Sequence, residues 1–211
     1  MTNNRLRFVE KEEIRGWERK HALRLRMKRR RSENENRDVK ERLMLENVLR
    51  LLETDFLQSD GAGTRLNVMI YLSFSLEAST DKLIKTLKEK GMRVYAPRIE
   101  NKEMVAVEIG EDYTLSALGI REPVGQAYNG KIDVIIAPLL AVDLCGNRLG
   151  YGGGYYDVFF RKHTCALRVG YGYDFQVLEN VPYTDDDERV ERIVTDKRIL
   201  VCNNKKTEEK F

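Results

Sequence analysis

The sequence predicts an α/β protein: a single three-layer α/β/α domain with a mostly parallel sheet, preceded by a basic N-terminal helix. Segments with strand and helix periodicity alternate through most of the chain, which is typical of parallel sheets with helical crossovers. One apolar run, DVIIAPLLAV at 133–142, is continuous, as expected for a strand that is covered on both faces. With 211 residues and 42% apolar content, the chain has the size of one domain with one core.

We expect this domain to occupy residues 1–203, with residues 1–15 as an N-terminal extension and the charged residues 204–211 as a disordered tail. The basic helix is predicted over 11–33. Its candidate core contacts are Ile14, Trp17, Leu23 and Met27.

A second helix is predicted over 38–57, because apolar residues repeat there at helical spacing. A Gly-rich and Ser-rich loop follows, and the period then changes to that of strands. The helix at 79–91 has Ser, Thr and Asp at its start and Gly91 at its end. The other predicted elements are strands at 67–74, 93–97, 104–109, 133–142, 166–173 and 192–201, and a helix at 154–163.

Charge is distributed unevenly along the chain. Residues 1–42 hold 15 Lys and Arg against 8 Asp and Glu, which leaves 22 against 26 in the remainder. Eight basic residues and no acidic residue lie between Arg19 and Arg31. This density indicates an anionic partner for the N-terminal helix.

Several classes of protein are excluded by what the sequence lacks. No window approaches eighteen consecutive apolar residues and no secretory signal begins the chain, so we expect no membrane span and a cytoplasmic location. Cys145, Cys165 and Cys202 are widely spaced and are expected to be reduced thiols without a zinc site. His21 and His163 stand in no known triad motif, which argues against a hydrolase triad.

The stretch CGNRLGYGGGYYD at 145–157 places five glycines among nine residues, directly after the apolar run. Ligands bind at the carboxyl ends of strands in open parallel sheets, and glycine amides at a helix N-terminus can converge on phosphate oxygens. Arg148 can contact a phosphoryl group in bidentate geometry, and Asp157 offers an oxygen suited to Mg²⁺. The stretch therefore predicts a phosphate cradle.

The stretch is not a P-loop, because no Lys-Ser or Lys-Thr pair follows the glycines. Two alternatives to a phosphate cradle stay open. A dinucleotide fingerprint would need a third glycine at position 155, which is Tyr155, although Asp174 lies about twenty residues further on. A tight turn without a ligand is the other alternative.

The run VDLCGNRLGYGGGYYD resembles the signature of the 5-formyltetrahydrofolate cyclo-ligase family, also called methenyltetrahydrofolate synthetase, whose pattern is close to D-x-x-G-x-R-L-G-x-G-x-G-Y-Y-D. The segments YLSFSLEAST, LGIREP and VPYTDDDERVERIVTD are also similar to members of this family. The fixed positions are met by Asp143, Gly146, Arg148, Leu149, Gly150, Gly152, Gly154, Tyr155, Tyr156 and Asp157.

The resemblance implies an enzyme that uses ATP and Mg²⁺ to convert 5-formyltetrahydrofolate to 5,10-methenyltetrahydrofolate, with release of ADP and phosphate through a phosphorylated formyl intermediate. Its partners would be these small molecules, without a membrane or a nucleic acid, and the chain would be a monomer or weak dimer. Phosphoryl transfer of this kind depends on positioning and charge neutralisation, which fits a chain without an obvious nucleophile.

The resemblance also implies roles for individual residues. Lys20 and Arg24, spaced K-x-x-L-R, would contact ATP phosphates from the N-terminal helix. The ATP-binding set is Lys20, Arg24, Gly146, Asn147, Arg148, Leu149, Gly150, Gly152, Gly153 and Gly154. The substrate-binding set is Leu72, Glu77, Tyr151 and Tyr155, with Glu77 holding the pteridine. The catalytic set is Arg148, Tyr155 and Tyr156.

Two carboxylates are implied as magnesium ligands, Asp157 and Asp187. Because three aspartates are adjacent, the register there leaves Asp186 and Asp185 as alternatives. The chain departs from the family in its N-terminal extension and in Val158, where bacterial members often carry Arg. These departures leave another pterin open as the substrate.

Two other functions stay open. The basic segment, with Arg29, Arg30 and Arg31, could bind RNA, although it has no interleaved aromatic residues for stacking and the rest of the chain is mildly acidic. A solvated helix face that carries two ATP-contacting residues is the favoured interpretation. An ATP-dependent ligase that acts on another pterin, or a protein that retains nucleotide binding alone, is the second alternative.

Overall fold

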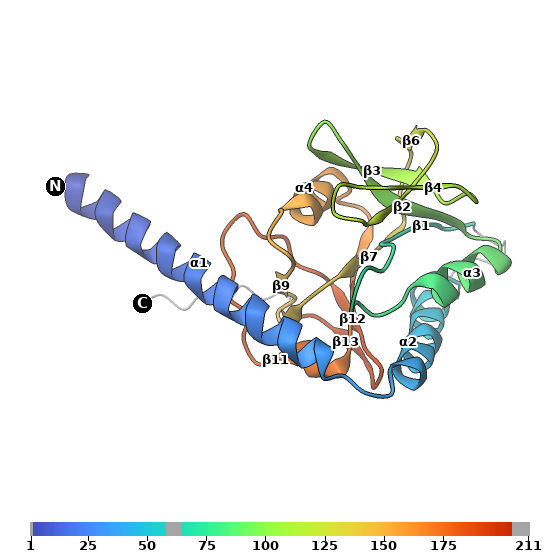
Figure 1. The fold of residues 1–211 in the computed structure, drawn as a ribbon, viewed down its shortest axis with the longest axis horizontal. Helices are drawn as coiled ribbons and strands as arrows, with labels where there is room; N and C mark the ends of the chain where they lie inside the picture. The colour runs from blue at the N-terminus through green and yellow to red at the C-terminus, as the bar shows by residue number, and fades with distance from the viewer. Residues whose placement is uncertain (1, 58–64, 204–211) are drawn as a thin grey trace.

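The computed structural model describes residues 2–57 and 65–203, with side chains from residue 16 onward (Figure 1). The helices are α1 (Thr2–Ser32), α2 (Arg37–Leu52), which continues as one π-helical turn over Glu53–Leu57, α3 (Asp81–Glu89) and α4 (Tyr155–Lys162), with a 3₁₀ turn at Asp174–Gln176. The main strands are β1 (Asn67–Ile70), β2 (Arg93–Glu100), β3 (Glu103–Glu108), β6 (Ala127–Tyr128), β7 (Val134–Pro138), β10 (Leu167–Tyr171), β12 (Arg192–Val194) and β13 (Ile199–Val201).

The main sheet has eight strands in the order β13-β12-β10-β7-β1-β2-β3-β6. The adjacent strands β12, β10, β7, β1 and β2 are parallel, and antiparallel pairs occur only toward the two edges of this sheet. The mostly parallel sheet of the sequence prediction is confirmed. Two small sheets accompany it: β11-β8-β9, with β8 (Ala141–Asp143), β9 (Arg148–Leu149) and β11 (Val177–Leu178), and the hairpin of β4 (Tyr113–Leu115) and β5 (Arg121–Pro123).

Helices cover both faces of the sheet, and the side chains of each central strand point alternately into two cores, one on each face. In β7, Val134 and Ile136 pack with α2 and α3 on one face, whereas Ile135 and Ala137 pack with α4 on the other. Figure 1 shows α2 and α3 together on one side and α4 on the opposite side. The three-layer α/β/α architecture is therefore confirmed.

The chain changes direction across the sheet between β1 and β7. From β1 it passes through α3 to β2 on one side, and it later returns to β7 on the other side of β1. The helices α3 and α4 that follow these two strands lie on opposite faces. Such a topological switch point leaves a crevice at the carboxyl ends of the two strands, where open α/β proteins bind ligands.

The basic helix α1 packs on the carboxyl edge of the sheet through one narrow face. Leu23 and Met27 are buried against Leu140, Leu149 and Val181. The predicted extension is continuous with this helix, whose N-terminal part projects away from the domain (Figure 1). The prediction that Trp17 is a core residue is wrong: its side chain is 62% exposed and stacks on His21.

Two predicted strands are each divided in the structure. The apolar run at 133–142 separates into β7 and β8, and the segment at 192–201 forms the antiparallel hairpin of β12 and β13. The sequence did not predict the first division, because Leu139 and Leu140 are as buried as the strand residues and no polar residue marks the bend. The predicted tail at 204–211 and most of the predicted loop after α2 lie outside the described residues.

None of the helices within residues 2–57 and 65–203 combines the length and apolar character needed to cross a bilayer.

Removing a side chain from the α3 layer tests the packing of the sheet. Leu87 belongs to α3 and is fully buried in the core that α3 shares with α2. We expect Leu87→Ala to lower the free energy of unfolding by about 2–5 kcal/mol. The exposed neighbour Lys85, as Lys85→Ala, is the control and is expected to change it by less than about 0.5 kcal/mol. Urea denaturation measures both, and equal effects would contradict the packing described.

Candidate active site

The glycine-rich segment is divided into two parts with different environments. Its first part is the turn between β8 and β9, and its second part is the exposed loop from Gly150 to Gly154 that enters α4. The two parts are separated by the buried Arg148 and Leu149.

The buried carboxylate of Asp143 holds the first part. It accepts hydrogen bonds from the amides of Cys145 (2.9 Å), Asn147 (3.0 Å) and Val181 (3.0 Å), and from the side-chain amide of Asn147 (2.9 Å). Gly146 adopts φ +82°, and a Cβ placed there would lie 2.2 Å from the carbonyl oxygen of Val190. Glycine is required at this position by the close approach of two backbone segments.

The second part presents unused donors. Gly152 and Gly154 adopt φ +104° and +69°, and Gly154 immediately precedes α4. Among the described residues, the amides of Gly152, Gly153 and Gly154 donate no hydrogen bond. Exposed amides at a helix N-terminus favour an anion, because the helix dipole adds positive potential there.

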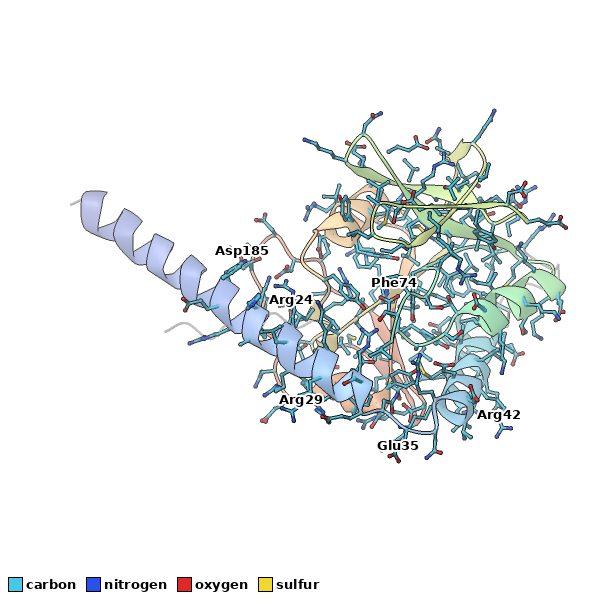
Figure 2. The ribbon with its side chains drawn as sticks, viewed as in Figure 1. Arg24, Arg29, Glu35, Arg42, Phe74 and Asp185 are labelled. Carbon is cyan, nitrogen blue, oxygen red and sulfur yellow. The ribbon has the colours of Figure 1, made fainter. Side chains whose placement is uncertain are left out.

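Basic side chains of α1 lie over this loop. Arg24 donates from Nε to the carbonyl oxygen of Gly150 (2.9 Å), and its guanidinium lies beside Gly152, where a Cβ would meet it at 3.3 Å. One turn earlier, Lys20 pairs with Asp187. Figure 2 shows Asp185, from the same acidic turn, beside α1. The structure thus brings Lys20 and Arg24 to the glycine loop.

Arg148 is buried beneath the loop at the carboxyl end of β7. Its Nη1 donates to the carbonyl oxygen of Pro138 (3.2 Å), and Nη2 lies 3.5 Å from a carboxylate oxygen of Asp157. The guanidinium stacks on the rings of Tyr156 and Phe160, at 5.3 and 5.7 Å from their centroids. Its Nε has no partner among the described residues, so a buried donor is left for a ligand or a water.

Each of the two predicted magnesium ligands accepts hydrogen bonds through one of its two carboxylate oxygens. Asp157 Oδ1 accepts from Arg148 and from the Glu188 amide (3.1 Å), and Asp187 Oδ2 accepts from Lys20 and Thr184. Within the described part of the chain, the second oxygen of each carboxylate accepts no hydrogen bond, and no group of three potential ligands occurs. This donor set fits Mg²⁺ that enters with a triphosphate, because such an ion is held by one or two carboxylates and phosphate oxygens.

Glu77 lies in the loop that follows β1 and is 8% exposed. Its carboxylate accepts from the amide of Phe74 (2.9 Å). Burial raises the pKa of Glu77, while the Phe74 amide, the Tyr151 hydroxyl and Arg31 act in the opposite direction. Leu72, in the same loop, is buried in the α2 and α3 core.

Tyrosines surround Glu77. Burial, together with the nearby Glu77 charge, raises the pKa of the Tyr71, Tyr151 and Tyr156 hydroxyls. The hydroxyls of Tyr156 and Tyr171 are buried without a partner among the described residues. These two hydroxyls are buried polar atoms that a ligand or a water can satisfy.

The predicted site residues therefore fall into separate groups. One group lies at the exposed loop and consists of Arg24, Gly152, Gly153 and Gly154. Tyr155 follows at the start of α4, where its side chain is 38% exposed and its ring lies against Gly153. Gly146, Asn147 and Leu149 were assigned to ATP, but they lie in the turn or the core: Asn147 also accepts from Arg189, and Leu149 packs under α1.

Sequence reasoning missed three residues of this region, Tyr71, Tyr171 and Arg31. The two tyrosines lie at the carboxyl ends of strands, where a ligand site is expected. Tyr71 directly follows β1, and Tyr171 is the last residue of β10. Arg31 was assigned to a solvated face, and that assignment is wrong, because it is 4% exposed. Its spacing of four and eight residues from Met27 and Leu23 was the available signal.

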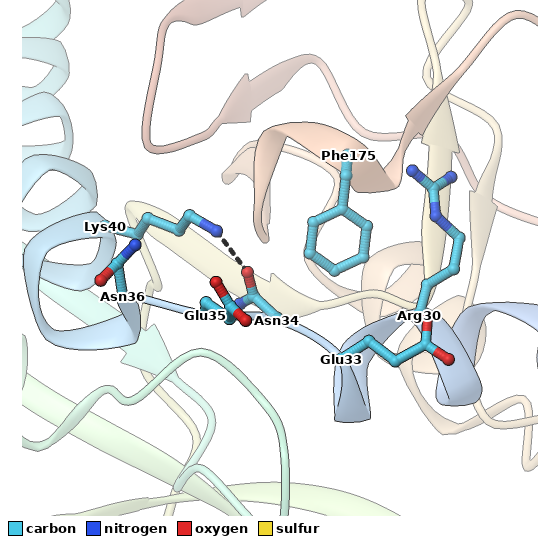
Figure 3. A pocket seen from close by; sticks show the side chains of 7 residues that line it. All are labelled: Arg30, Glu33, Asn34, Glu35, Asn36, Lys40 and Phe175. Carbon is cyan, nitrogen blue, oxygen red and sulfur yellow. Dashed lines mark hydrogen bonds between the residues drawn. The ribbon is translucent and has the colours of Figure 1, made fainter.

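A shallow polar cavity of about 410 Å³ lies at the junction of α1 and α2 (Figure 3). Arg30 stacks there on Phe175, and Lys40 donates to the side chain of Asn34. Acidic and basic side chains both line it, so its charge favours no single class of ligand.

The fold and the loop define an α/β protein with a candidate phosphate site at a topological switch point. A sequence profile of the 5-formyltetrahydrofolate cyclo-ligase family matches residues 8–196. The chain belongs to this family, and it is an enzyme of the ligase class.

Individual relatives agree with this assignment. The chain is 32% identical over 143 residues to the 5-formyltetrahydrofolate cyclo-ligase of Escherichia coli K12, an alignment that covers 63% of this chain and 79% of that protein. The structure of Aquifex aeolicus 5,10-methenyltetrahydrofolate synthetase superposes with a TM-score of 0.72 at 28% identity, covering 90% of this chain and 96% of the other. The Mycoplasma pneumoniae synthetase shares the fold, with a TM-score of 0.65 at 18% identity and coverage of 84% and 98%.

Two alanine substitutions distinguish the structural part of the glycine segment from its exposed part. Gly146 and Gly154 both adopt positive φ, but only a Cβ at Gly146 meets other atoms. We expect Gly146→Ala to destabilise the protein by about 1–3 kcal/mol more than Gly154→Ala, because the clash adds to the shared strain. Thermal unfolding of the two variants measures the difference. Equal melting temperatures would show that the Val190 contact is not a constraint.

Proposed function

We propose that this enzyme converts 5-formyltetrahydrofolate and ATP to 5,10-methenyltetrahydrofolate, ADP and phosphate. The observation that carries the proposal is the position of the exposed loop 150–154. It lies under the basic residues of α1 and, through Tyr151, beside the buried Glu77. A phosphate site and a pterin site would therefore share one crevice.

The nucleotide would bind on the loop side. The free amides of Gly152, Gly153 and Gly154 are suited to phosphate oxygens, and Lys20 and Arg24 would add positive charge from above. Lys20 would exchange Asp187 for a phosphate oxygen. Gly146, Asn147 and Leu149 would support the loop from beneath rather than touch the nucleotide.

The pterin would bind in the tyrosine region. The ionised carboxylate of Glu77 can accept two N–H groups of a pteridine ring, and Leu72, Tyr151 and Tyr155 would line the ring and its substituents. Tyr156 would lie between the pterin and the phosphates, because its ring is 5.3 Å from the Arg148 guanidinium carbon and its hydroxyl is affected by the charge of Glu77.

In the proposed reaction, the formyl oxygen attacks the γ-phosphorus of ATP and ADP leaves. N10 then attacks the activated carbon and gives up its proton, the C–O bond breaks, and phosphate departs with that proton as hydrogen phosphate while the ring closes. Arg148 is buried and holds a free Nε donor, so it is placed to stabilise charge on the transferring group. No protein nucleophile is needed, since the step depends on alignment and charge neutralisation.

Magnesium would be held by Asp157 and Asp187 through their free oxygens together with the phosphates. The ion supplies charge neutralisation at the phosphate oxygens when it is bound. Asp186 is the weaker alternative for the second ligand, because its carboxylate is exposed on the acidic turn while its carbonyl oxygen accepts from Arg161. We also propose a cytoplasmic location, and a monomer or weak dimer as the oligomeric state.

The near-ultraviolet absorbance of the methenyl product tests the proposal directly. Purified protein mixed with 5-formyltetrahydrofolate and Mg-ATP is expected to give an absorbance increase that requires all three components. Absence of this signal from folded protein would refute the proposed reaction, and turnover of a different pterin would correct its substrate.

Substitution of the α1 residues tests the nucleotide half. Loss of a charged hydrogen bond costs about 1.5–3 kcal/mol, so Lys20→Ala and Arg24→Ala are each expected to raise the KM for ATP by about 10- to 100-fold. Arg26→Ala is the matched control on the exposed side of the same helix turn. Steady-state kinetics measure all three, and an equal response of Arg26→Ala would indicate diffuse attraction instead of contact.

Neutral replacements of the carboxylates test the metal half. We expect Asp157→Asn and Asp187→Asn to raise the Mg²⁺ concentration for half-maximal activity by about tenfold or more, because each removes a charged ligand. Asp185→Asn should behave as the unmodified enzyme. The measurement is activity as a function of the free Mg²⁺ concentration at a fixed ATP concentration. If Asp185→Asn has the large effect and Asp187→Asn the small one, the second ligand is Asp185 and not Asp187.

A further inference from the structure

One arginine of the basic run differs from its neighbours. Arg31 is 4% exposed, whereas Arg29 and Arg30 are exposed. It shares the inward face of α1 with Met27 and Leu23, one and two turns earlier. A buried guanidinium is costly unless its donors are used, so the contacts of Arg31 require an explanation beyond solubility.

The donors of Arg31 are divided between the Glu77 loop and the glycine loop. Nε donates to the carbonyl oxygen of Leu76 (3.0 Å), the residue before Glu77. Nη1 donates to the hydroxyl of Tyr151 (2.7 Å), which belongs to the glycine loop. The guanidinium carbon also lies 5.9 Å from the centroid of the Tyr151 ring. The single planar guanidinium of Arg31 thus holds one residue of the Glu77 loop and one residue of the glycine loop.

Arg31 is also the arginine whose charge acts on Glu77. The groups that face this carboxylate are the Phe74 amide, the hydroxyls of Tyr151, Tyr71 and Tyr156, and Arg31. Arg37, from α2, bonds instead to the main-chain carbonyl of Glu77 (2.6 Å). Within residues 16–57 and 65–203, whose side chains the structure describes, Arg31 has no ion pair with a carboxylate.

We propose that Arg31 is a positioning residue of this enzyme, which holds the Glu77 loop and Tyr151 together so that the two face the pterin in one arrangement. The inference rests on the proposed function. Because Arg31 lies on the helix that carries Lys20 and Arg24, it also ties the substrate half of the crevice to the element that would bind phosphates.

Kinetics of substituted enzymes test this inference. Arg31→Ala removes both hydrogen bonds and the charge, so the KM for 5-formyltetrahydrofolate is expected to rise about 10- to 100-fold, with a much smaller change in the KM for ATP. The acid limb of kcat/KM for the folate should move to higher pH. The reason is that loss of a nearby positive charge raises the pKa of Glu77 further, and the protonated carboxyl accepts fewer pterin N–H groups.

Two further variants separate the contacts from the charge. Arg31→Lys keeps a positive charge but cannot bond to Leu76 and Tyr151 in the same fork, so the acid limb should return toward its original pH while the KM stays raised. Tyr151→Phe removes one of the two acceptors and keeps the ring. Its effect on the KM and that of Arg31→Lys should be less than additive in the double variant, since both break one hydrogen bond. Arg29→Ala is the matched control, because its side chain is exposed at 84%.

The outcomes distinguish the possibilities. If kcat/KM for both substrates falls in equal proportion and the pH profile keeps its position, Arg31 has only a structural role and the inference is wrong. If Arg31→Ala does not fold, as shown by circular dichroism, the Arg31→Lys and Tyr151→Phe pair decides, and strict additivity overturns the inference. A lack of methenyl product from the unmodified enzyme, with ATP still bound, refutes the proposed function instead and the inference falls with it.

Discussion

The packing of one face of α1 on the carboxyl edge of the sheet is the contact on which the candidate site depends. Leu23 and Met27 supply the apolar surface, and they set the register of the helix against β8 and β9. With that register established, the side chains one turn before and one turn after Met27 must point at the same edge. Arg24 therefore meets the glycine loop, and Arg31 meets the Glu77 loop. A helix that is mostly charged can be held in this way, because a narrow apolar stripe is enough when long basic side chains cover the surrounding surface.

The glycine-rich segment shows how a single motif can combine two physical requirements. Around Gly146, two backbone segments approach closely and the carboxylate of Asp143 satisfies the amides of the turn, so the requirement is one of folding. From Gly152 to Gly154 the amides stay exposed and have no acceptor among the described residues, so they are available to the anion of the proposed function. The rigid first part orients the second, and a loop oriented in advance loses less entropy when an anion binds.

Much of the fold followed from periodicity. The alternation of strands and helices predicted the layers and the parallel sheet, and the elements with strong patterns, such as α3 and α4, were placed within two residues of their ends. The division of 133–142 into β7 and β8 was not predictable, because buried residues continue through the bend and no polar residue marks it. In the site, the motif pointed to Arg148 and Asp157, which the structure brings within 3.5 Å. Composition alone does not separate Arg31 from Arg29 and Arg30, and only its spacing from Leu23 and Met27 indicated that it lies on the buried side of the helix.

The sequence by itself determined the class of fold, the segment suited to phosphate and the family resemblance, because each of these depends on local pattern: strand and helix period, glycine spacing and a contiguous signature. Tertiary structure alone decided which carboxylates and amides are already satisfied, that Glu77 is surrounded by tyrosines, and that Tyr151 reaches from the glycine loop to Arg31. These facts depend on which residues meet across the switch point between β1 and β7. Such meetings arise from long-range packing of segments more than a hundred residues apart, for which a single chain carries no local signal.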